Sequence, residues 1–118
     1  MSRRTERVGE QVRAELSRML REEVTDPRIG FVTLVRVDVS PDLCSALVFW
    51  SLVETDGSPS REDTEAGLES AAAFLRRGLA AKLALRRVPA LRFRYDPSLE
   101  LGDQTLSLLR TLRHEPTE

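Results

Sequence analysis

The chain has 118 residues, of which 41% are hydrophobic and 31% charged, with a net charge of −1; this fits one folded domain and excludes a disordered chain. No apolar run is long enough to cross a bilayer, and the arginine-rich first residues lack the apolar core of a secretory signal. Cys44 is the only cysteine, which excludes an internal disulfide and a cysteine-based zinc site, so a cytoplasmic protein is expected.

The first predicted helix spans about residues 6–24. Thr5 can cap its start, because a threonine oxygen can accept a hydrogen bond from a backbone N–H of the first turn. Asp26-Pro27 ends the helix, since the residue before a proline avoids the helical conformation. Five apolar residues recur at helical spacing and predict one buried face: Val8, Val12, Leu16, Met19 and Leu20.

Two strands are predicted next, over residues 31–40 and 44–53. In the first, Val35, Val37 and Val39 alternate with polar residues, which is the period of a half-buried strand. The turn-forming residues 40–43 join the two strands as an antiparallel hairpin. The second strand is apolar on both sides around Trp50, so the sequence leaves open which of its faces is exposed.

A second helical region follows a loop over residues 54–60, and Ser58-Pro59 or Ser60 can start it. On a straight helix Phe74 would lie outside the apolar face, which predicts a kink between two helices near residues 71–73. Pro89 ends this region. The predicted apolar face carries Leu68, Ala72, Leu75, Leu79 and Leu83.

The third predicted strand covers residues 91–95, where apolar side chains alternate with Arg92 and Arg94. We expect Phe93 and Tyr95 to face the core. A short final helix is predicted over about residues 101–112, followed by a loose tail at 114–118. A hairpin followed by a helical crossover to a third strand predicts an α+β fold in which helices cover one face of a small sheet.

The positive charge of the chain is concentrated in one stretch. Residues 70–95 carry seven cations and no acid, whereas residues 42–69 carry seven acids and one cation. A basic field attracts polyanions such as nucleic acid, although an ordinary solvated basic helix would give the same pattern. The cations of the basic stretch are Arg76, Arg77, Lys82, Arg86, Arg87, Arg92 and Arg94. Near the N-terminus, Arg3, Arg4 and Arg7 can add to them.

The sequence offers little for catalysis. His114 is the only histidine and falls in the predicted tail, and no base lies near Cys44 in the sequence, so we expect that thiol to be packed rather than reactive. Gly67 and Gly78 are isolated within the helical pattern and do not form a phosphate-binding loop. We therefore predict no enzyme activity, no catalytic residue, no cofactor and no metal.

Several motifs in order resemble one known family, bacterial ribosome-binding factor A, from about Arg4 to Leu109. The resemblance is specific because the motifs occur together along nearly the whole chain. They are Asp26-Pro27-Arg28-Ile29-Gly30, Val32-Thr33, Val37 to Leu43, Phe74 to Arg77, Leu85 to Phe93, Tyr95-Asp96, Ser98 and Gly102.

The resemblance implies a single type II KH-like domain over residues 1–113, with the order α-β-β-α-kink-α-β, no Gly-x-x-Gly loop and a short C-terminal helix. The family has a small-residue Ala-x-Gly break between two helices. Here Ala71, Ala72 and Ala73 occupy that place. Because Ala73 replaces the glycine, the kink is expected to be shallower.

The resemblance also implies a factor without enzyme activity that binds the free small (30S) ribosomal subunit and helps to mature 16S rRNA near its 5′ region. The implied partners are the 30S subunit and 16S rRNA, with no membrane and no small-molecule substrate, and the protein is expected to be a monomer. The ten cations named above would neutralise rRNA phosphates. Arg28 has a structural alternative, in which it pairs with a nearby carboxylate.

A second function from another class stays open. The apolar second strand around Trp50 could form a dimer or add to the sheet of a partner, which would make the chain a protein-interaction module. Salt dependence separates the two, because phosphate contacts give a steep slope and an apolar interface does not.

Overall fold

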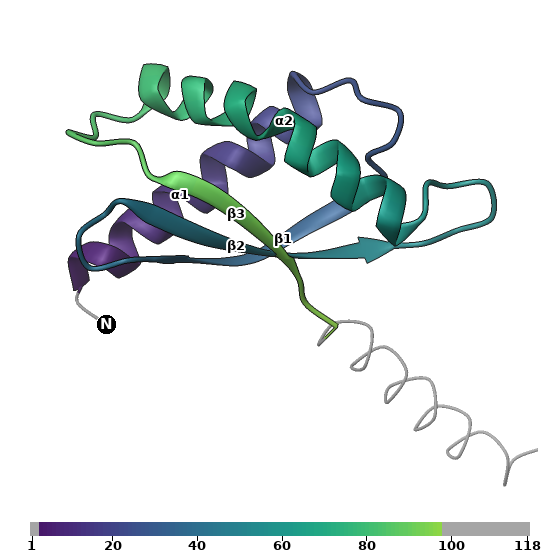
Figure 1. Ribbon diagram of the computed structural model, residues 1–118, viewed down its shortest axis with the longest axis horizontal. Helices are drawn as coiled ribbons and strands as arrows, with labels where there is room; N and C mark the ends of the chain where they lie inside the picture. The colour runs from purple at the N-terminus through teal and green to yellow at the C-terminus, as the bar shows by residue number, and fades with distance from the viewer. Residues whose placement is uncertain (1–2, 98–118) are drawn as a thin grey trace, which may run out of the picture.

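The computed structural model describes residues 3–97. The elements follow in the order α-β-β-α-β (Figure 1). They are α1 (Arg3–Glu22), β1 (Phe31–Val39), β2 (Ser45–Val53), α2 (Arg61–Lys82) and β3 (Ala90–Tyr95). The final helix and the loose tail predicted from the sequence lie outside the described residues.

The three strands form one sheet in the order β1-β2-β3. β1 and β2 are antiparallel, which confirms the predicted hairpin, and α2 crosses over so that β3 lies parallel to β2. α1 packs mainly on β1 and α2 on β3, and both helices cover the same face of the sheet (Figure 1). The predicted α+β arrangement is therefore confirmed.

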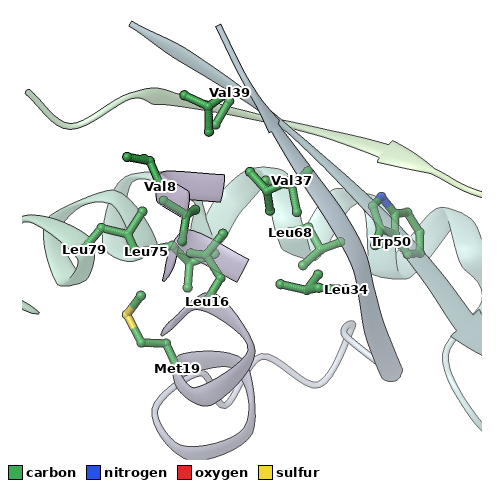
Figure 2. Close-up of a cluster of buried hydrophobic side chains, with 13 residues drawn as sticks. Val8, Leu16, Met19, Leu34, Val37, Val39, Trp50, Leu68, Leu75 and Leu79 are labelled. Atoms are coloured by element: carbon green, nitrogen blue, oxygen red, sulfur yellow. The ribbon is translucent and has the colours of Figure 1, made fainter. Parts of the chain in front are cut away.

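The core lies between the two helices and the covered face of the sheet (Figure 2). The two helices and the strands β1 and β2 each supply one buried row, and β3 adds half-buried side chains. Burying one Val, Leu or Met side chain fully contributes about 1.5–3 kcal/mol. Phe93 and Tyr95 pack against this core, as predicted. The rings of Trp50 and Tyr95 contact each other edge to face, with 5.1 Å between their centres. The buried residues include Val12, Leu16, Met19, Leu34, Val37, Val39, Val48, Trp50, Leu68, Leu75 and Leu79.

Two local details differ from the sequence-based expectations. α1 begins at Arg3, so Thr5 lies within its first turn and is buried rather than capping the helix. In β1 the pairing with β2 shifts between Leu34 and Arg36. This bulge interrupts the alternation, because the extra residue Val35 has no partner on β2, and Leu34 rather than Val35 joins the buried row.

Ser60 starts α2, which selects one of the two predicted starts. Its side-chain oxygen accepts a hydrogen bond from the backbone N–H of Asp63 at 3.1 Å. This satisfies one of the free N–H groups that every helix start exposes. The acidic residues Glu62 and Asp63 lie in the first turn, where they suit the helix dipole.

The predicted kink in α2 was wrong. The helix runs without interruption from Arg61 to Lys82, and Phe74 is 40% exposed instead of turning into the core. Alanine has the highest helix propensity, so the run of Ala71, Ala72 and Ala73 continues the helix where a glycine would weaken it. One helix replaces the two that were expected.

Candidate RNA-binding surface

The ten cations predicted to bind RNA all lie exposed on the surface. Within residues 3–97, none of them forms an ion pair with a carboxylate. The cations that do so are Arg13, Arg18, Arg28 and Arg36. The charge of the ten is therefore available to a ligand, but the fold distributes them over three separate places.

The first group surrounds a cavity of about 470 Å³. Arg4 from the first turn of α1 meets Arg86 and Arg87 from the loop between α2 and β3, and Asp42 from the turn between β1 and β2. These three segments lie at the same end of the molecule, at the left in Figure 1. The rest of the lining consists of Val8, Leu43, Ala84, Leu85 and Pro89. We call this site the arginine cavity.

Hydrogen bonds hold one wall of the arginine cavity in place. Arg87 Nη1 donates to Cys44 Sγ at 3.0 Å, and this bond raises the pKa of Arg87. Asp42 Oδ1 accepts from the Ser40 hydroxyl at 2.6 Å and from the Cys44 backbone N–H at 3.0 Å. The Ser40 bond is the main reason that the pKa of Asp42 is lowered. The thiol of Cys44 is half-buried, and its sulfur accepts the hydrogen bond from Arg87.

Arg3 and Arg7 stand beside Arg4 on the first two turns of α1 and are exposed at the same end of the molecule. They lie outside the lining of the arginine cavity. A ligand that fills the cavity and continues along α1 would meet them next.

The second group lies on α2. Arg77 and Lys82 are exposed there. Arg76 differs, because its Nη2 donates to the backbone carbonyl of Val88 at 3.0 Å and so fastens the loop that carries the cavity arginines. Arg76 is thus a structural support of the arginine cavity as well as a charge.

The third group consists of Arg92 and Arg94, which belong to the same basic stretch of the sequence as the cations on α2 and in the loop after it. The structure separates them from it. Leu91, Phe93 and Tyr95 of β3 pack against the core under the helices, so the alternating Arg92 and Arg94 point from the opposite face of the sheet. We call this opposite face, which no described element covers, the open face.

Arg28 takes the structural alternative. Its Nη2 lies 2.7 Å from Asp26 Oδ2, and its backbone N–H donates to Asp26 Oδ1 at 2.9 Å. These bonds close the turn at Pro27 that leads from α1 to β1. They also lower the pKa of Asp26.

The strand that carries Trp50, β2, has no free backbone edge at which another strand could pair. β2 is the central strand, and its two edges are already paired with β1 and β3. Trp50 itself has no exposed surface. An added strand at β2 is therefore excluded, because its backbone is already paired on both sides, and the buried indole ring of Trp50 cannot itself form a contact between copies. The apolar side chains of this strand that remain available to a partner are those on the open face.

The apolar side chains of β2 that reach the open face include Leu47 and Phe49 in the middle of the strand. Arg36 of β1 lies with its guanidinium carbon 3.9 Å from the centre of the Phe49 ring. Arg36 is not among the ten cations predicted to bind RNA. It lies far from the basic stretch in the sequence, and only the strand register brings it near Arg94.

Other classes of site are not evident in the described part of the chain. Residues 3–97 hold no group of three or more His, Cys, Asp or Glu side chains placed to bind a metal ion. Neither of the two helices there has a stretch apolar and long enough to span a membrane.

Comparison with known proteins gives one consistent match. Residues 4–109 match the sequence model of the ribosome-binding factor A family. Ribosome-binding factor A of Thioalkalivibrio sulfidiphilus is 44% identical over 106 residues, which cover 90% of this chain and 81% of that protein.

Solved structures agree with the sequence match. The crystal structure of ribosome-binding factor A from Thermus thermophilus has a TM-score of 0.68 at 23% identity, covering 77% of this chain and 93% of that one. A homology model of the Thermus protein, fitted into a cryo-EM map of a 30S complex, has a TM-score of 0.62 at 24% identity and covers 75% of this chain and 91% of that one. The KH-like fold is thereby confirmed, apart from the missing kink.

Proposed function

This chain belongs to the ribosome-binding factor A family, and from that premise we propose that it binds the free small ribosomal subunit and assists late maturation of 16S rRNA, including its 5′ region. The structural relative from Thermus thermophilus has been fitted into a map of its complex with the 30S subunit. A partner made largely of RNA accounts for the ten exposed cations that form no ion pair with a carboxylate among the described residues, although the chain as a whole is nearly neutral.

The arginine cavity is the observation that carries the proposal. Arg4 and Arg86-Arg87 come from opposite ends of the sequence and converge on one concave site. Guanidinium groups bind phosphate oxygens through paired hydrogen bonds. The apolar lining, which includes Leu43 and Leu85, can receive the flat face of an unstacked base, as single-stranded RNA presents it.

The proposed mechanism is binding and remodelling without chemistry at the RNA. Phosphate contacts fix the position of a protein on RNA but release no product, so the chain would act by favouring one arrangement of the rRNA over another. Because the proposed partner, the small ribosomal subunit, is in the cytoplasm, we expect the protein there too. We expect a monomer, because one copy of the domain suffices for the contacts described.

Sedimentation of cell extracts on sucrose gradients tests this proposal. We expect the protein in the fractions of free small subunits and not in those of translating ribosomes. The double variant Arg86→Ala/Arg87→Ala should shift to the top of the gradient, because it loses both guanidinium groups of the loop.

A matched control removes two arginines from elsewhere on the surface. Arg13 and Arg21 of α1 line a different depression, so Arg13→Ala/Arg21→Ala should sediment like the unaltered protein. Equal amounts of the unaltered protein on small subunits and on translating ribosomes would contradict the proposal.

A further inference from the structure

The open face of the sheet has a composition that the arginine cavity does not account for. A sheet with one solvated face normally alternates apolar residues toward the core with polar residues toward water. Here the central strand also presents Leu47 and Phe49 outward, and both are half-buried. The exposed pair Phe31 and Val53 lies farther along the sheet, beyond the polar pair Thr33 and Ser51. Leu47 and Phe49 thus form a short apolar strip on a face that normally carries polar side chains, which indicates a contact surface.

The charges beside this strip are mostly positive. In the strand register Phe49 lies between Arg36 on β1 and Arg94 on β3, and Leu47 lies between Asp38 and Arg92. Three arginines against one aspartate leave the middle of the open face with an excess of two positive charges. Directly paired residues on antiparallel strands are about 4.5–5.5 Å apart, so Arg36 is within reach of Phe49. Arg94 and Arg92 lie beside Phe49 and Leu47 in the register of β2 with β3.

Arg36 is held in a stack rather than extended into water. Its guanidinium carbon lies 3.9 Å from the centre of the Phe49 ring, and its Nε donates to Asp38 Oδ2 at 3.3 Å. Arginine guanidinium planes and aromatic rings are the two side-chain surfaces on which proteins stack unpaired RNA bases. The open face therefore carries a preformed stacking platform.

A hollow lies next to this platform. Its volume is about 340 Å³, and Leu47, Arg92 and Arg94 contribute to its lining. The apolar floor and the two flanking guanidinium groups match a nucleotide, which has a flat base and a charged phosphate. Arg92 and Arg94 have no ion pair within residues 3–97, so both can turn to a phosphate.

We propose that the open face binds a single-stranded RNA segment, with one base stacked at Phe49 and Arg36 and phosphates at Arg92 and Arg94. This inference rests on the proposed function, because it assigns a second RNA contact to the same partner. The open face is turned away from the helices, and its hollow shares no lining residue with the arginine cavity, so this contact is separate from the one at the arginine cavity. The protein would thereby hold two stretches of RNA at once.

Single-stranded RNA fits this face better than the other possible occupants. A duplex keeps its bases stacked on one another and offers no free base face to Phe49. A second copy of the chain would bring Arg92 and Arg94 against an equally basic surface, and like charges disfavour that contact.

Fluorescence anisotropy with a labelled ten-nucleotide oligouridylate tests the stacking. Phe49→Leu keeps an apolar side chain but removes the ring, and we expect it to weaken binding about tenfold, within the range for one base–aromatic stack. Phe49→Trp should retain the affinity, because it keeps a ring. A duplex of the same length should bind equally to both variants.

A second variant, which leaves the core unchanged, tests whether Arg92 and Arg94 contact phosphates. Arg92→Ala/Arg94→Ala should make the log–log salt slope shallower by about 1.4, at about 0.7 for each lost phosphate contact on a single strand. The matched control is Arg13→Ala/Arg21→Ala, which should leave the slope unchanged. Thermal melts of all variants verify that each one is folded.

The outcomes separate this inference from the proposed function. If Phe49→Leu and Arg92→Ala/Arg94→Ala bind the oligonucleotide like the unaltered chain while Arg86→Ala/Arg87→Ala loses small subunits, the inference is overturned and the proposed function stands. If the open-face variants instead change the oligomeric state in light scattering without changing RNA affinity, the face is an interface between copies and the inference is overturned as well.

Discussion

Gly9 of α1 lies directly against the backbone carbonyl of Val37 in β1. A Cβ atom added at Gly9 would stand 2.6 Å from the Val37 oxygen, well inside van der Waals contact. The absent side chain therefore sets how closely α1 can approach the sheet, and this approach brings Val12 and Leu16 into the core.

Gly9→Ala should destabilise the protein by about 1–3 kcal/mol, the usual cost of overpacking, although alanine favours a helix more than glycine does. Gly78→Ala is the comparison, because a Cβ there would meet the sulfur of Met19, the end of a flexible side chain that can rotate away. Urea unfolding should show the larger loss for Gly9→Ala. The opposite order would mean that α1 shifts more easily than Met19.

Removing the two loop arginines should weaken RNA binding while the fold stays intact. Both are exposed beside the arginine cavity, and exposed substitutions usually change stability by no more than about 0.5 kcal/mol. Arg87→Ala also removes the hydrogen bond to Cys44 Sγ, which should cost roughly 0.5–1.5 kcal/mol in addition. On single-stranded RNA, Arg86→Ala/Arg87→Ala should make the salt slope shallower by about 1.4 if each residue contacts one phosphate. An unchanged slope would place the RNA elsewhere.

Arg76 and Arg77 are neighbours on α2, but replacement by alanine should lower the stability of the protein more at Arg76 than at Arg77. Arg76→Ala removes the hydrogen bond to the Val88 carbonyl and should cost roughly 0.5–1.5 kcal/mol of stability. Arg77→Ala removes an exposed charge without a hydrogen bond among the described residues and should cost less. Amide hydrogen exchange near Val88 should increase only for Arg76→Ala. Equal exchange in the two variants would show that Arg76 does not support the loop.

The sequence was sufficient to predict the elements whose periodicity is strong. Val12, Leu16 and Met19 repeat at helical spacing, and all three are fully buried in α1. The hairpin of β1 and β2 could also be predicted, because its turn residues and its two apolar strands lie next to each other in the chain. The pairing of Arg28 with Asp26 was also open to prediction, since the two are only two residues apart.

The distribution of the arginines could not be predicted, because it depends on strand register and on contacts between distant residues. Arg92 and Arg87 are five residues apart in the sequence, yet one points from the open face and the other contacts Cys44, 43 residues earlier. The bulge at Val35 has no signal in the alternation of Val35 with Val37. Charge clustering along a sequence therefore predicted which residues are cationic surface, but not which of them act together.

Acid should weaken the turn at Pro27. The hydrogen bonds from Arg28 lower the pKa of Asp26 below its ordinary value of 3.8. Because the folded state binds the Asp26 proton less tightly than the unfolded state, this carboxylate stabilises the fold fully above its ordinary pKa. The contribution is lost as the pH falls through the lower, folded pKa.

Carboxyl NMR titration of Asp26 measures this directly and should give a pKa below 3.8. The urea midpoint should fall between about pH 5 and pH 2 less steeply in Asp26→Asn, and Arg28→Ala should flatten the same profile, because either change removes the pair. Titration of Asp26 at its ordinary value in the unaltered protein would show that the pair does not persist in solution.

A last prediction concerns the stability of α2 when Ala73, within this unbroken helix, is replaced. This residue lies exposed in the middle of α2, in the place where the family resemblance implies a break. Glycine in the interior of an exposed helix costs about 1 kcal/mol relative to alanine. Ala73→Gly should therefore lose about that amount in urea unfolding. Ala66→Gly, at another exposed position of the same helix, is the control and should lose a similar amount.

A helix that bends at Ala73 would instead tolerate glycine there better than at Ala66, because glycine costs less where the helix is already bent than where it is regular. A markedly smaller loss for Ala73→Gly would show that α2 is bent in solution and that the exposed ring of Phe74 can turn toward the core.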